Sequence, residues 1–179
     1  TADATPLRTR KLKATSLVGN NPQPSLQHTR RAFGLPSKYI GQYKGLIILV
    51  AFSDQDFLNP ATANNTWSHL ANDVNYHSGR AVGSMHDYFY DQSYGLFDIT
   101  FDVVGPIHMD YGYAHYGHND EKGLDDNVGE LVRDACMAVD DEVDFNDYDW
   151  DGDGVADIVF LLYAGDGEHE YSYSRPDLI

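Results

Sequence analysis

Five aspartates and two glycines fall within the eleven residues from Asp147 to Asp157. Carboxylates packed this densely repel one another, so a cation between them would stabilise the loop. In calcium loops, Asp side chains stand at positions 1, 3 and 5, a glycine stands at position 6, and the backbone carbonyl of position 7 is a ligand. With Asp149 as position 1, the sequence predicts a calcium site with these ligands: Asp149, Asp151, Asp153, the Val155 carbonyl and Asp157.

The predicted loop differs from a helix-loop-helix calcium site at its end. Position 12, where such a site has a bidentate Glu, is Phe160. The apolar run around it, 158–163, is typical of a buried strand. Calcium prefers six to eight oxygens, so Asp144, Asp147 or a distant group would supply the rest. The alternative is an acidic, solvated turn, but such a turn does not need paired glycines at these offsets.

A second group of possible metal ligands follows the middle of the chain. His115 and His118 stand near Asp120 and Glu121. Two histidines in a glycine-containing loop lack the helical i, i+4 spacing that holds two imidazoles on one ion, so exposed, structural histidines are the preferred interpretation. The single cysteine, Cys136, stands at an apolar position of a predicted helix and is interpreted as a core thiol.

The hydrophobic pattern predicts three strands and three helices. The strands are 44–52, 97–103 and 158–163. Strands separated by helical segments indicate an α/β (α+β) fold. The helices are predicted from their capping residues. A short helix begins at Asn65 or Thr66, and a second begins at Ser84 and is ended by Gly95. A third begins with a capping box of Asn127 and Glu130 and ends near Val139.

Charge divides the chain into two parts. Residues 1–44 hold eight Lys or Arg against one Asp, whereas residues 45–179 hold four against 27 Asp or Glu. The first part also lacks periodicity, and is expected to be an extended arm or a propeptide remnant; the second part is the globular domain. Its negative charge excludes nucleic acid as a partner and favours cations. The apolar runs 46–52 and 158–164 are too short to span a membrane.

Four segments resemble the immune inhibitor A type of secreted zinc metallopeptidases, namely 45–54, 84–95, 144–157 and the strand that follows to Gly165. The resemblance implies a metzincin-like upper subdomain with a mixed, twisted sheet and flanking helices. Residues 45–179 would be the N-terminal half of the catalytic domain, and residues 1–44 a propeptide or its remnant.

In that family a helix with the motif HExxH binds zinc, and its Glu is the general base on the zinc-bound water. The motif is not in this sequence, and the family places it soon after the segment that ends here at Ile179. Zinc is therefore expected only in a longer chain, no catalytic residue is assigned, and this chain alone is expected to be inactive.

The resemblance implies part of a secreted endopeptidase that acts on proteins or peptides. Location outside the cell is also favoured because calcium loops of this kind fill reliably where calcium is millimolar. The alternative function is a calcium-stabilised extracellular binding or adhesion module without catalytic residues, whose recognition surface would be the histidine and tyrosine loops.

Overall fold

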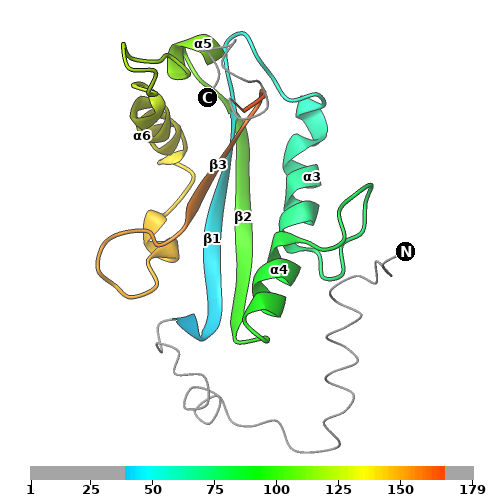
Figure 1. The fold of residues 1–179 in the computed structure, drawn as a ribbon. Coiled ribbons are helices and arrows are strands. Elements are labelled where there is room, and N and C mark those ends of the chain that lie inside the picture. The colour runs from blue at the N-terminus through cyan, green and yellow to red at the C-terminus, as the bar shows by residue number, and fades with distance from the viewer. Residues whose placement is uncertain (1–38, 168–179) are drawn as a thin grey trace, which may run out of the picture. The chain divides into compact units, whose positions relative to one another are not determined.

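The computed structural model describes residues 39–167, as an α/β arrangement of a sheet with helices (Figure 1). Most of the predicted basic arm, residues 1–38, lies outside the described residues. The described chain divides into two compact units, residues 39–43 with 70–100 and residues 44–69 with 101–167. No helix of the described residues is both long and apolar enough to cross a membrane.

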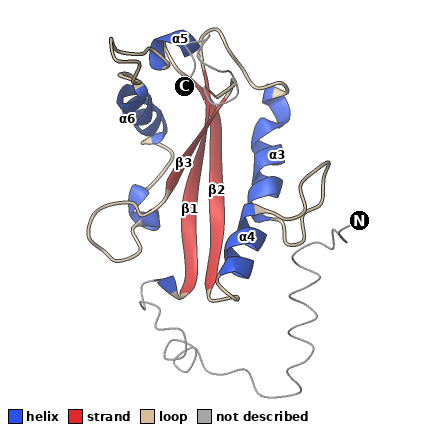
Figure 2. Cartoon of the chain, viewed as in Figure 1, coloured by secondary structure: helices blue, strands red, loops and turns tan. Residues whose placement is uncertain are grey.

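The sheet has three strands in the order β2-β1-β3, namely β1 (Gly41–Ala51), β2 (Phe97–His108) and β3 (Val159–Tyr163) (Figure 2). β3 runs parallel to β1, with Leu46 opposite Val159. All three predicted strands are confirmed, and so is the fold class. The three described strands are all parallel, so the mixed strand directions implied by the resemblance are not seen among them.

The core of the larger unit is built on β1. Its residues from Leu46 to Ala51 are completely buried, as expected for a continuous apolar strand covered on both faces. Alternate side chains of this strand join one apolar cluster with the buried face of α6 (Val128–Val139). That face is formed by Leu131, Ala135 and Val139. Cys136 is half-buried beside it, and burial raises the pKa of its thiol.

The bounds of α6 agree with the sequence prediction, but its predicted capping box is wrong. Asn127 stands at the N-cap without a side-chain cap bond. Its Nδ2 instead donates to the carbonyl of His115, at 2.7 Å. Glu130 likewise bonds the His115 ring rather than the N-cap backbone. Both side chains that would form the local cap are therefore hydrogen-bonded to His115 instead.

The helix α3 (Pro60–Asn72) begins five residues before the predicted cap at Asn65 or Thr66. Proline is favoured at the first helical position because it lacks the N–H that would be unsatisfied there. Within the larger unit, Asn64 reaches from this helix to β2. Its Nδ2 donates to the carbonyls of Val103 (2.8 Å) and Gly105 (3.1 Å).

Gly105 marks an irregular point of β2. Its φ is +90°, and a Cβ built on it would lie 2.6 Å from the Leu49 carbonyl oxygen. No other residue fits so close to the neighbouring strand. The amide of Asn64 therefore bonds the backbone at the place where β2 departs from regular geometry.

In the smaller unit, Ser84 caps α4 (Met85–Gln92) as predicted, and Asp87 completes a capping box with it. Asp87 is almost fully buried. Its carboxylate accepts the backbone N–H groups of Asn75 (3.1 Å), Tyr76 (3.2 Å) and Ser84 (3.1 Å). One carboxylate thus fixes both the helix start and the loop before it. Gly95 adopts the predicted left-handed conformation, with a φ of 75°.

Replacing Asn64 with Asp should destabilise the protein, because a carboxylate cannot donate to the two carbonyls and would repel them. A buried group left without its partner costs about 1–3 kcal/mol. We expect the free energy of unfolding, measured with a chemical denaturant, to fall by that order. The control is Asn65→Asp, which changes the charge equally on an exposed neighbour. Equal stability of the two variants would contradict this role of Asn64.

Candidate metal centre

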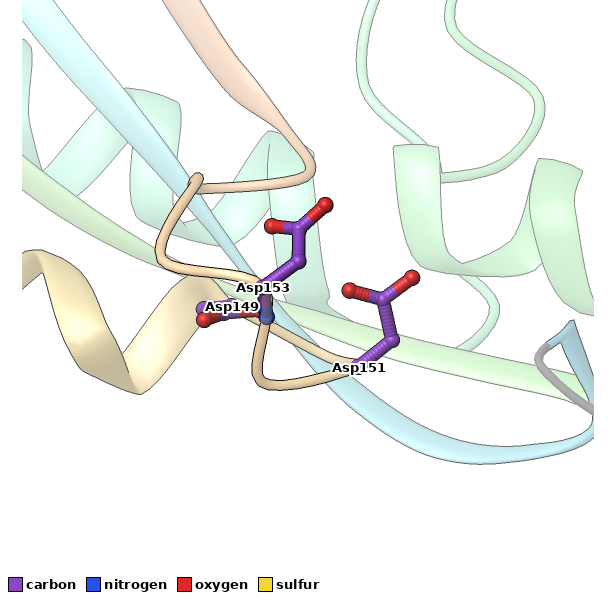
Figure 3. A group of neighbouring side chains, drawn as sticks. All are labelled: Asp149, Asp151 and Asp153. Atoms are coloured by element: carbon purple, nitrogen blue, oxygen red, sulfur yellow. The ribbon is translucent and has the colours of Figure 1, made fainter.

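The predicted metal loop connects the short 3₁₀ helix η2 (Phe145–Tyr148) to β3. Asp149, Asp151 and Asp153 each place a carboxylate oxygen within 4.8 Å of the other two (Figure 3). Within residues 39–167, they form the one group of three or more His, Cys, Asp or Glu side chains that lie close enough to share an ion. The spacing in the sequence thus leads to proximity in space.

Asp149 organises the loop through its own hydrogen bonds. Its Oδ1 accepts the N–H groups of Gly152 (2.8 Å) and Asp153 (3.2 Å), and its Oδ2 accepts that of Gly154 (2.8 Å). These bonds, the one from Gly154 most of all, lower the pKa of the Asp149 carboxyl. Gly152 and Gly154 have φ values of 75° and 86°, in the left-handed region that glycine adopts without strain.

The other predicted ligands have different local roles. Asp153 Oδ1 accepts the N–H of Val155, at 2.9 Å. Asp157 lies outside the group of three. Its Oδ2 accepts the N–H of Trp150 (2.7 Å), while its own N–H donates to the Tyr148 carbonyl (2.9 Å). Asp157 therefore closes the loop by joining its end to its start.

Neither of the additional ligands suggested by the sequence joins the carboxylate group. Asp144 accepts the backbone and side-chain N–H groups of Asn146, and so caps η2. Asp147 lies 3.5 Å from the Nζ of Lys44. The loop is thus grouped around three carboxylates, while Asp144 and Asp147 have other partners.

Two aromatic side chains fasten the loop to the sheet, a feature that the sequence did not reveal. The ring N–H of Trp150 donates to the carbonyl of Lys44 (2.8 Å), and the buried Tyr148 donates its hydroxyl to Asp102 on β2 (3.0 Å). Lys44 Nζ bonds the same carboxylate, at 2.7 Å. Lys44 and Trp150 are 106 residues apart, so no local pattern could pair them. The one local signal is the presence of aromatic residues between aspartates.

Burial and the charge of Asp102 act on the ionisable groups of this junction. Burial is the main cause that raises the pKa of Tyr148 to about 12, and the hydrogen bond to Asp102 adds to it. The bond to the same carboxylate raises the pKa of Lys44. Both groups therefore keep their protons to a more alkaline pH than they would in water.

The two histidines considered as metal ligands each pair with a separate carboxylate. His115, on α5 (Tyr113–Tyr116), lies 3.1 Å from Glu130, and His118 lies 2.9 Å from Asp126. Asp120 forms a turn by accepting backbone N–H groups. The structure therefore does not gather His115, His118, Asp120 and Glu121 into one site within the described residues.

The family model of the immune inhibitor A peptidase M6 catalytic domain matches residues 39–170. The chain belongs to this family. A search of curated proteins finds no match. As a member of the immune inhibitor A peptidases, the chain is assigned to proteins that hydrolyse peptide bonds with the help of a metal.

The described residues of this immune inhibitor A family member contain one group of three or more possible metal ligands, and its members are all carboxylates. The 179 residues contain no HExxH. In the described part of the chain, no group of metal-binding side chains includes a histidine. The carboxylates of the aspartate loop are oxygen donors, which suit hard cations such as calcium better than zinc.

Alkaline pH should weaken the fold through Tyr148 and Tyr116, whose pKa values are both raised to about 12. An unfolded tyrosine loses its proton near pH 10, so the folded chain binds more protons between about pH 10 and 12. The free energy of unfolding should therefore fall as pH rises through this range. Phenolate absorbance should show two late-titrating tyrosines, and Tyr148→Phe should remove one of them. Titration of all tyrosines near pH 10 would contradict the buried hydroxyl at this junction.

Proposed function

We propose that this chain is the calcium-stabilised N-terminal part of the catalytic domain of a secreted zinc metalloendopeptidase. The observation that carries the proposal is the family match over residues 39–170. It is supported by the loop of three carboxylates that precedes β3. The substrates would be proteins or peptides outside the cell.

The aspartate loop would bind the calcium ion. Three carboxylates with formal negative charge suit a divalent cation, and their oxygens are the donors that calcium takes. The proposed ligands are Asp149, Asp151, Asp153, the Val155 carbonyl and Asp157. The ion would remove the repulsion among the carboxylates and make the loop more rigid. The hydrogen bonds of Trp150 to β1 and of Tyr148 to β2 would then hold these strands more firmly.

Peptide hydrolysis in this family would use zinc to polarise the attacking water. The 179 residues contain no HExxH, so we propose that the zinc ligands belong to sequence outside them. The role of the residues described here is then structural. They would hold the sheet against which the catalytic elements pack.

Calcium removal should lower the melting temperature, because a ligand at a hundred times its dissociation constant adds about 2.7 kcal/mol of stability. For a chain of this size that corresponds to roughly 5–10 °C. Asp151→Asn should abolish the response to calcium. Asp141→Asn, which removes the same charge from an exposed residue outside the loop, should respond as the wild type does. A wild-type melting temperature that a calcium chelator leaves unchanged would refute the site.

The 179-residue chain should hydrolyse no denatured protein substrate and retain no stoichiometric zinc after dialysis. A longer version of the chain that includes an HExxH helix should hydrolyse the substrate and retain zinc. The test is to measure the zinc content of the two proteins and the release of peptides from the substrate by each. Hydrolysis by the short chain that a zinc chelator stops and zinc restores would show that His115 and His118 form a site after all. Inactivity of both proteins would favour the binding-module function instead.

A further inference from the structure

The smaller unit contains a cavity of about 450 Å³ at the turn between α4 and β2. Its walls are mainly aromatic and aliphatic, and its apolar side chains are Tyr39, Phe89, Tyr94, Leu96 and Phe97. We call this cavity the Tyr94 pocket. Its apolar walls favour an apolar occupant, because contact removes their surface from water.

The turn that forms the pocket has an unusual backbone. Tyr94 has a φ of 58°, in the left-handed region that few residues other than glycine adopt. The turn is fixed by the Gly95 N–H, which donates to the Tyr90 carbonyl at 2.7 Å. The Ser93 hydroxyl also bonds the backbone on both sides, at Tyr90 and Phe97. The strained residue carries a ring that is 75 % exposed at the pocket. Strain of this kind is typical of positions that hold a ligand.

In the sequence, a short apolar segment directly precedes the first residue of the pocket. Tyr39 is the first described residue and is itself a wall of the pocket. Three apolar residues stand just before it in an otherwise polar stretch, namely Phe33, Leu35 and Pro36. An extended chain spans at most 3.3–3.6 Å per residue, so Pro36 is within about 11 Å of Tyr39 and Phe33 within about 22 Å. A segment tethered this closely reaches an effective concentration that a free peptide rarely matches.

The residues that flank the apolar segment and the smaller unit carry charges of opposite sign. Arg30, Arg31 and Lys38 flank the apolar segment. The described residues of the smaller unit contain four aspartates, of which Asp87 is buried, against one arginine, so the unit as a whole carries net negative charge. Opposite charges would orient the segment, and the apolar contact would persist where salt screens those charges.

We propose that the arm of this chain docks intramolecularly, with Phe33–Pro36 seated in the Tyr94 pocket. This interaction surface goes beyond the proposed peptidase function and does not depend on it. The contact would hold the basic arm on the smaller unit and cover the bonds after Arg30 and Arg31.

The test is limited tryptic digestion of the 179-residue chain, with mass spectrometry following cleavage after Arg30 and Arg31. Phe33→Ser should speed this cleavage about tenfold or more, since cleavage follows the population of the undocked state. Tyr94→Ser, which leaves the cleaved sequence unchanged, should do the same. The two changes together should add little to either alone. Leu17→Ser, an equal loss of apolar surface elsewhere in the arm, should cleave at the wild-type rate.

Two controls keep the outcome decisive. In denaturant all variants should be cleaved at one rate, which excludes an effect of Phe33 on the protease itself. Circular dichroism should show that Tyr94→Ser is folded; if it is not, Phe33→Ser alone decides, because that residue lies outside the pocket walls. Wild-type cleavage rates for Phe33→Ser would overturn the proposal. Protection that increases with protein concentration would also overturn it, by showing that a second copy supplies the segment.

Discussion

The complete burial of β1 is the constraint on which the larger unit depends. Leu46 to Ala51 are inaccessible to water, so a strand must pair on each side and side chains must cover each face. The parallel register of Leu46 opposite Val159 then places the end of the aspartate loop beside the start of β1. The bond from Trp150 to the Lys44 carbonyl is a consequence of that register. A shift of β3 by one residue would turn its side chains to the opposite face of the sheet.

The aspartate loop shows how side chains of like charge can be held close together. The Asp149 carboxylate accepts hydrogen bonds from three backbone N–H groups, which offset part of its charge and favour its ionised form. The glycines allow the chain to turn around that carboxylate. Asp151 and Asp153 are exposed on the same loop, each with a carboxylate oxygen within 4.8 Å of the other and of Asp149. In the proposed calcium site, Asp149 would fix the shape of the loop, and Asp151 and Asp153 would supply further carboxylate oxygens to the ion.

The sequence predicted the elements whose pattern is local and missed the contacts whose partners are distant. The three strands and α6 follow from hydrophobic spacing alone, and Ser84 and Gly95 from cap and turn chemistry. The three grouped aspartates also follow from spacing, because one short loop carries them all. Asn127 and Glu130 were assigned to a local cap, yet both bond His115. The Lys44, Asp102 and Tyr148 junction joins three separate segments, and only the folded chain reveals it.

The two hydrogen bonds of Asn64 have a consequence for how this protein can be produced. Asn64-Asn65-Thr66 is a sequon for N-linked glycosylation, and the sugar would be attached to the same Nδ2 atom that donates to Val103 and Gly105. In a eukaryotic secretory pathway the glycan is added before folding is complete. A modified Nδ2 keeps a single N–H, so the chain could not form both bonds to β2 in their present geometry. Thr66 is exposed, and its replacement by Ala would remove the sequon while leaving the Asn64 amide in place.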